Sequence, residues 1–276
     1  MWKNLTKSQL DAAYNNSKAV PNSAEIIQAW QLSSNDVKNT LAYKADIPYA
    51  GDDFPAFDFY LANKNAPTVA FIHGGFWQMR SKDDFAFIVP ALLEKRINVA
   101  MLGYRLAPSV TMDQIVKDIQ DGIRSTINLL KNDGFIQPKV WLIGWSAGAH
   151  LASMQMNDEN ILGVTAISGI YDLDPMRFCY VNDQLKLDEE ASRRNSPMLL
   201  PQHPEKILDV YVGGDELPEM QGQSQNYFDY RKSLNAPGIF TNIPFKNHYT
   251  ILDELTQPNG AILEQLIERI NSISSA

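Results

Sequence analysis

The sequence has very little cysteine: Cys179 is the only one among 276 residues. A single cysteine excludes a disulfide within the chain and is typical of a protein from a reducing compartment. No segment approaches the roughly 18 consecutive apolar residues that a membrane-spanning helix requires. Residues 1–4 lead into polar sequence without the apolar core of a secretory signal peptide. We therefore expect a soluble, cytoplasmic protein that makes no contact with a membrane.

Positive charge is also in the minority. The chain has 24 Lys and Arg residues against 32 Asp and Glu residues, for a formal net charge of −8. Proteins that bind nucleic acid neutralise phosphate groups with a basic surface, so this balance argues against a nucleic-acid partner. It leaves a small-molecule substrate as the expected partner and is compatible with a homodimer.

Linkers and cofactor motifs are absent as well. No Pro-, Ser- or Gly-rich linker, internal repeat or low-complexity tract divides the chain, so residues 1–276 are expected to form one domain. The sequence has neither an H-E-x-x-H motif nor a cluster of Cys and His, and no G-x-G-x-x-G motif follows an apolar run. We therefore expect neither a metal nor a dinucleotide cofactor.

What the sequence does contain is a regular alternation of apolar runs and segments with helical spacing. Apolar runs predict strands at 57–61, 68–73, 97–103, 140–143, 162–168, 207–212 and 238–244. Short helices are expected within residues 1–40, and longer helical segments at 83–95, from Thr111 onward, at 222–234 and at 259–272. This alternation indicates an α/β fold, with a mostly parallel central sheet covered by helices on both faces. Residues 171–202 interrupt the alternation and are expected to form a small cap.

The most informative stretch is Gly144-Trp-Ser-Ala-Gly148, which directly follows the apolar run at 140–143. A strand that turns sharply into a helix at this motif holds Ser146 in a strained conformation, with its hydroxyl exposed above the strand ends. Glycines on either side of the serine let neighbouring backbone approach without a Cβ clash. The helix that opens at Ala147 directs its free N–H groups toward the serine. The motif therefore predicts a nucleophilic serine.

Two further segments supply the partners that such a serine needs. His73-Gly74-Gly75 follows a predicted buried strand, and its glycines leave backbone N–H groups open for an oxyanion hole. A general base must follow the acid in the chain order of this architecture, and His248 is the one histidine placed late enough. The other three histidines are expected to have different roles. His73 is expected to hold the glycine loop, His150 to be a hydrogen-bonded packing residue, and His203 to be exposed.

The acid that orients His248 has two candidates, the adjacent carboxylates Asp215 and Glu216. Both lie at the end of the predicted strand 207–212. Neighbouring side chains at a strand end point in different directions, so only one of them can reach the imidazole. In α/β folds with a nucleophilic serine at a strand–helix corner, the acid commonly lies three residues after the glycine that ends its strand. Counting from Gly213 therefore favours Glu216. Asp215 is the shorter and more usual residue type and stays the alternative.

With these residues located, the sequence resembles the α/β-hydrolases, and in particular the arylformamidase (N-formylkynurenine formamidase) family. The resemblance spans nearly the whole chain. It is carried by His73–Gln78, Tyr104–Pro108, Gly144–Leu151, Ser168–Leu173, Arg194–Pro197, Pro218-Glu219, Gln223-Ser224 and Asn247–Gln257. The family's acid lies two residues before the proline of its Pro-Glu pair, which here is Glu216. Family members often have Asp at that position and Tyr where this chain has Phe76.

The resemblance implies a serine hydrolase that cleaves an N-formyl aromatic amine to formate and the free amine through a formyl-serine. It implies Ser146 as nucleophile, His248 as base and Glu216 as its orienting acid, with backbone N–H groups of Gly75, Phe76 and Ala147 as the oxyanion hole. Trp77 and Tyr171 are expected to contact the substrate; ordinary core packing is the alternative for Trp77. A general short-acyl carboxylesterase with the same triad, or a non-catalytic scaffold of the same fold, are the competing functions.

Overall fold

The computed structural model describes residues 4–49 and 55–274. Residues 1–3, on which part of the signal-peptide prediction rests, lie outside these ranges. None of the helices in the described ranges combines the length and apolar character needed to cross a bilayer.

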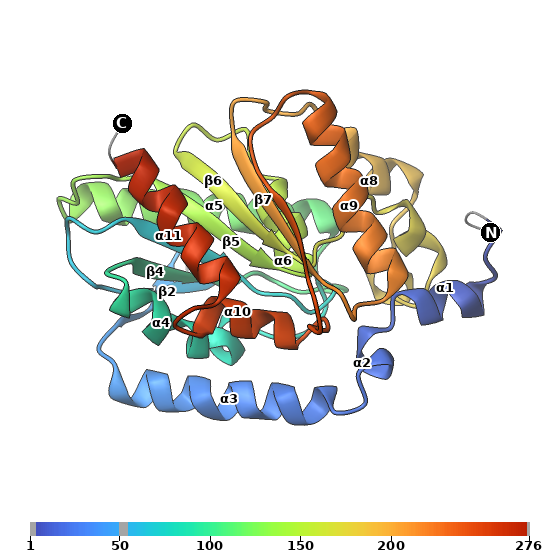
Figure 1. Ribbon diagram of the computed structural model, residues 1–276, viewed down its shortest axis with the longest axis horizontal. Coiled ribbons are helices and arrows are strands. Elements are labelled where there is room, and N and C mark those ends of the chain that lie inside the picture. The colour runs from blue at the N-terminus through green and yellow to red at the C-terminus, as the bar shows by residue number, and fades with distance from the viewer. Residues whose placement is uncertain (1–3, 50–54, 275–276) are drawn as a thin grey trace.

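Within the described ranges, eight strands form one sheet in the order β1-β2-β4-β3-β5-β6-β7-β8. The strands are β1 Lys44–Pro48, β2 Ala56–Tyr60, β3 Thr68–Ile72, β4 Asn98–Leu102, β5 Val140–Trp145, β6 Ile161–Ile167, β7 Ile207–Gly213 and β8 Phe240–Ile243. The β1–β2 and β2–β4 pairs are antiparallel, and every other pair is parallel. The predicted mostly parallel sheet is confirmed (Figure 1). Strand β1 was not predicted, because it lies at the edge of the sheet and is mostly exposed, and so lacks an apolar run.

Helices cover both faces of the sheet (Figure 1). The α-helices are α1 Lys7–Ala13, α2 Asn16–Ala19, α3 Ser23–Thr40, α4 Val89–Glu94, α5 Met112–Asn132, α6 Ala147–Ser153, α7 Asn182–Leu185, α8 Glu189–Arg194, α9 Pro218–Ser233, α10 Asp253–Thr256 and α11 Ala261–Ser274. The 3₁₀ helices are η1 Lys82–Ile88, η2 Asp174–Phe178, η3 Pro197–Leu199 and η4 Thr250–Leu252. One buried apolar cluster lies between the sheet and α5, α6 and α9, and a second lies between the sheet and α3, α4 and α11.

Two predicted helical segments differ from the structure. Residues 83–95 form the 3₁₀ helix η1 followed by α4, because Pro90 at the start of α4 has no N–H to continue a helix from before it. Residues 23–40 form one long helix, α3, which packs along η1, and only α1 and α2 before it are short. Residues 171–202 contain η2, α7, α8 and η3, short elements that interrupt the strand-helix alternation as predicted.

Candidate active site

Ser146 stands at the corner between β5 and α6, as the glycine pattern predicts. Its backbone has φ 56° and ψ −120°, a conformation that L-residues rarely adopt. A Cβ on Gly144 would lie 2.2 Å from the carbonyl oxygen of Gly148, and a Cβ on Gly148 would lie 2.0 Å from that of Ile72. Neither position can therefore accept a side chain without moving α6 away from β3 and β5.

Ser146, His248 and Glu216 are joined by hydrogen bonds. The Ser146 Oγ lies 3.0 Å from His248 Nε2, and His248 Nδ1 lies 2.7 Å from Glu216 Oε2. The three residues come from the β5–α6 corner, from the segment after β8 and from the segment after β7, and all three are buried. With the imidazole proton on Nδ1, the ring donates to Glu216 and accepts from the Ser146 hydroxyl, which is the arrangement of a nucleophile, a base and an orienting acid.

Glu216 is held by hydrogen bonds at both carboxylate oxygens. Its Oε1 accepts from the Ser168 hydroxyl at 2.5 Å and from the Gly213 N–H at 2.7 Å, while Oε2 faces His248. The neighbouring Asp215 is exposed, whereas the carboxylate that His248 Nδ1 contacts belongs to Glu216. Of the two carboxylates that the sequence offered, the structure therefore brings Glu216 to His248.

The segment that carries His248 is fixed from two sides. The Trp145 indole N–H donates to the His248 carbonyl at 2.9 Å. The Asn247 side-chain oxygen accepts from the backbone N–H groups of Tyr249 and Thr250, at 2.9 and 3.0 Å. These contacts fix the backbone on both sides of His248, whose imidazole lies within hydrogen-bond distance of Ser146.

The glycine loop after β3 turns through three successive positive φ angles, at Gly75 (119°), Phe76 (49°) and Trp77 (61°). The turn is closed by the Gly75 carbonyl, which accepts from the N–H groups of Gln78 and Met79 at 3.1 Å each. Gly75 and Phe76 lie in the wall of the same pocket as Ser146. Ala147 is the first residue of α6, where a helix leaves its N–H groups without intrahelical partners.

A narrow pocket of about 40 Å³ opens at Ser146 and His248. It is lined by Asn16, Ser17, Ile27, Trp30, Gly75, Phe76, Met79, Arg80, Phe85, Trp145, Ser146, His248 and Tyr249. Four of these residues come from α2 and α3, at the N-terminal end of the chain, and sequence reasoning did not find them. That segment carries no motif, so its contribution to the pocket follows only from the path of the folded chain.

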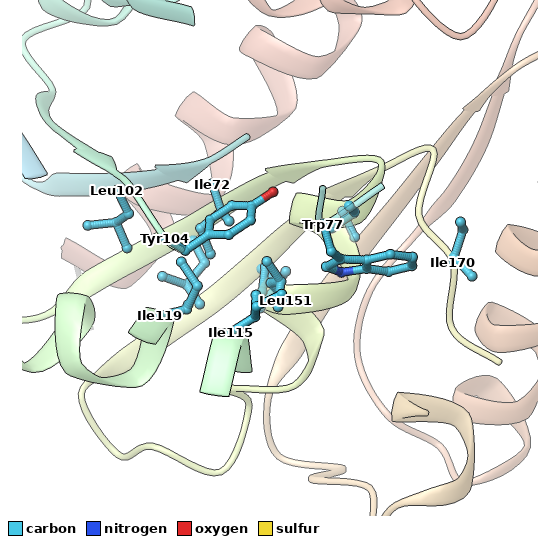
Figure 2. Close-up of a cluster of buried hydrophobic side chains, with 14 of the residues drawn as sticks. Ile72, Trp77, Leu102, Tyr104, Ile115, Ile119, Leu151 and Ile170 are labelled. Atoms are coloured by element: carbon cyan, nitrogen blue, oxygen red, sulfur yellow. The ribbon is translucent and has the colours of Figure 1, made fainter. Parts of the chain in front are cut away.

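Trp77 and Tyr171 do not line this pocket, so the expectation that they contact the substrate is corrected. Both side chains are fully buried, Trp77 in the cluster drawn in Figure 2, near Leu151 and Ile170. The Trp77 indole N–H donates to His150 Nδ1 at 3.1 Å, and the Tyr171 ring stacks on Tyr227 with centroids 4.4 Å apart. The positive φ angles at residues 76 and 77 turn the loop so that the indole faces the core.

Two of the remaining histidines are buried, and burial lowers the pKa of both His73 and His150 to about 4. His73 Nδ1 lies 2.7 Å from the Gly74 carbonyl, and its ring stacks on Tyr104, so His73 does hold the glycine loop. His150 packs as a hydrogen-bonded core residue between Trp77 and the Asn195 carbonyl, which lies 2.7 Å from Nε2. His203 is half-buried rather than exposed.

Comparison with known proteins places these features in context. The family model BD-FAE matches residues 57–188, which include the glycine loop and the β5–α6 corner. A kynurenine formamidase of Danio rerio is 29% identical over 291 residues, and the match covers 98% of each chain.

Solved structures agree on the architecture. A Silicibacter sp. TM1040 protein described as a candidate thioesterase superposes with a TM-score of 0.83 at 25% identity, over 95% of this chain and 99% of its own. An esterase of Pyrobaculum calidifontis superposes with a TM-score of 0.74 at 16% identity, over 94% of each chain. The fold is that of an α/β-hydrolase. The protein is a hydrolase of the amidase or esterase type that is similar to kynurenine formamidases over nearly its whole length.

Proposed function

We propose that this protein hydrolyses the formamide bond of N-formylkynurenine or a similar N-formyl aromatic amine, giving formate and the free amine. The observation that carries the proposal is the hydrogen-bonded series Ser146–His248–Glu216 at a narrow pocket. The nearly full-length similarity to a kynurenine formamidase supports the choice of substrate.

In the first step the Ser146 oxygen attacks the formyl carbon while His248 Nε2, 3.0 Å away, takes the hydroxyl proton. Glu216 holds the Nδ1 proton at 2.7 Å and stabilises the imidazolium that forms. The oxyanion of the tetrahedral intermediate accepts hydrogen bonds from the backbone N–H groups of Gly75, Phe76 and Ala147. Each such donor typically contributes about 3–4 kcal/mol of transition-state stabilisation.

In the second step the C–N bond breaks, and His248 gives its proton to the departing nitrogen so that a neutral aryl amine leaves. Water then enters, His248 takes one of its protons, and the resulting hydroxide adds to the formyl-serine. Collapse of this second intermediate breaks the bond to the Ser146 oxygen, which takes the proton from His248, and releases formic acid, which ionises to formate in solvent. The reaction consumes one water and requires no redox change.

The size of the pocket supports a very small acyl group. Its volume is about 40 Å³, which is room for only a few water molecules. Phe76, Trp145 and Phe85 contribute large aromatic surfaces to its wall. A longer acyl chain would have to displace packed side chains, and overpacking typically costs about 1–3 kcal/mol.

The test compares three substrates: N-formylkynurenine by formate release, and p-nitrophenyl acetate and butyrate by nitrophenol release. We expect the formyl substrate to have the highest kcat/KM and the butyrate ester the lowest. Equal kcat/KM for all three, or hydrolysis of the esters alone, would favour the general short-acyl carboxylesterase.

Replacing the nucleophile tests the chemistry itself. Ser146→Ala should lower kcat on every hydrolysed substrate by on the order of a million-fold. The unfolding temperature should stay near the wild-type value, because the hydrogen bond of the serine side chain is the one to His248. Activity within tenfold of wild type would exclude Ser146 as nucleophile, and a wild-type protein inactive on all three substrates would favour the scaffold.

A further inference from the structure

Asn16 is a buried amide with nothing to bind. It lies at the start of α2, its residue is 3% exposed, and it lines the pocket that contains Ser146. Among the described residues, neither its side-chain oxygen nor its side-chain nitrogen has a hydrogen-bond partner. A buried polar group left without a partner costs about 1–3 kcal/mol of stability, so an apolar side chain would be the more stable choice here.

The two polar side chains next to Asn16 in the sequence, Asn15 and Ser17, each have a partner. The Asn15 side-chain oxygen caps α2 by accepting from the Lys18 N–H at 3.0 Å. The Ser17 hydroxyl lies 2.8 Å from the Tyr249 hydroxyl. The unmatched donor and acceptor of Asn16 are therefore particular to that side chain and to the pocket that it faces.

Arg80 provides a second, independent observation at the same pocket. Its side chain lines the pocket and is half-buried, at the end of the glycine loop beside the exposed Met79. No carboxylate of the described residues lies within ion-pair distance of its guanidinium. A guanidinium placed in this way fits a carboxylate in a planar, bidentate pair.

We infer that Asn16 and Arg80 form a recognition site for the α-amino-acid portion of the substrate, an inference that rests on the proposed formamidase function. The enclosed volume of about 40 Å³ is filled by the formyl group at Ser146, so the amine portion must lie at the mouth of the pocket. Asn16 and Arg80 are pocket-lining polar side chains that remain free to bind that portion there. An α-amino acid presents an ammonium donor and a carboxylate acceptor. The Asn16 oxygen accepts from the ammonium, and Arg80 donates to the carboxylate.

The experiment compares N-formylkynurenine with formanilide, which has the same formamide on an aromatic ring but no amino-acid tail. Wild type, Asn16→Leu and Arg80→Met are assayed by formate release on both substrates. Each substitution should lower kcat/KM for N-formylkynurenine on the order of ten- to a hundredfold and leave formanilide within about threefold. The loss should lie mainly in KM, because the tail is bound alike in the ground state and the transition state.

Thermal unfolding separates recognition from a structural role. Asn16→Leu should unfold at the wild-type temperature or higher, because it removes an unpaired buried amide. The matched controls are Asn22→Leu and Arg96→Met, which alter exposed residues outside the pocket and should leave both kcat/KM values unchanged.

The outcomes distinguish the two proposals. If wild type releases formate from both substrates but the variants keep N-formylkynurenine activity, or lose both activities equally, the recognition site is wrong and the formamidase function stands. If wild type releases formate from neither substrate, the formamidase function is wrong and the recognition site is overturned with it.

Discussion

At the scale of single residues, the two carboxylate oxygens of Glu216 have different hydrogen-bond partners. Oε1 is fixed as an acceptor by the Ser168 hydroxyl and the Gly213 N–H, at 2.5 and 2.7 Å. Oε2 is thereby the oxygen that faces His248 Nδ1. The carboxylate thus selects the imidazole tautomer whose Nε2 can accept the proton of Ser146.

This arrangement predicts the effect of Glu216→Gln. The two donors at Oε1 would keep the glutamine oxygen in place, so its NH₂ group would face His248 and favour the tautomer with the proton on Nε2. That tautomer cannot accept from Ser146, and kcat should fall on the order of ten-thousandfold. Steady-state kinetics on any hydrolysed substrate provide the measurement.

The control for this prediction is Asp215→Asn, because Asp215 is exposed and the imidazole is hydrogen-bonded to Glu216 instead. It should retain kcat within about threefold of wild type. A larger loss from Asp215→Asn than from Glu216→Gln would reverse the assignment of the acid.

At the scale of elements, the glycine loop and α6 are tied together behind the pocket. Trp77 ends the run of positive φ angles in the loop, and its indole N–H donates at 3.1 Å to His150, one turn beyond Ser146 in α6. His150 in turn faces the Asn195 carbonyl just after α8. One buried imidazole therefore connects the loop, the helix behind the nucleophile and the 171–202 segment.

Trp77→Phe tests this connection while keeping an aromatic ring in the core. Removing the indole N–H leaves the buried His150 Nδ1 without a partner, which should lower the free energy of unfolding by about 1–3 kcal/mol. The ratio of kcat/KM for formyl and acetyl substrates should stay near the wild-type value, because Trp77 does not line the pocket. Urea unfolding measures the stability, and kinetics on the formyl and acetyl substrates measure the ratio. If the kcat/KM ratio changed while the free energy of unfolding did not, Trp77 would contact the substrate after all.

At the scale of the whole molecule, the two buried histidines make stability depend on pH. Burial lowers the pKa of His73 and of His150 from 6.5 to about 4, so the unfolded chain binds more protons than the folded protein between these values. Their stabilising contribution is complete above about pH 6.5 and is lost as the pH falls toward 4. In His150, a proton on Nδ1 would also replace the acceptor that the Trp77 N–H needs.

Urea unfolding at pH 7, 5.5 and 4.5 should therefore show a falling free energy of unfolding, by about 2 kcal/mol for each histidine between pH 7 and 4.5. His150→Gln should reduce the steepness of that fall, because one of the two titrating groups is removed. A slope unchanged by the substitution would show that His150 is not a source of the pH dependence.

Much of the fold could be predicted from the sequence because buried parallel strands and amphipathic helices leave periodic patterns. The seven predicted strands were found within two residues of their ends, and the helix expected from Thr111 onward is α5, with Thr111 as its N-cap. The exposed edge strand β1 and the break at Pro90 left weaker patterns, and both were missed.

The sequence by itself indicated the nucleophile and the base at the strand ends and favoured Glu216 over Asp215 as the acid. Gly144 and Gly148 mark a corner where a side chain would clash with neighbouring backbone, and the count from Gly213 favoured Glu216, which the structure then places at His248. Only the tertiary structure decided what surrounds that chemistry. Asn16 reaches the pocket from a segment 130 residues before Ser146, and three positive φ angles turn Trp77 away from the pocket into the core. Spacing along a chain encodes which face of an element is buried, but the direction of a loop side chain and its distant neighbours follow from backbone angles and packing that spacing does not encode.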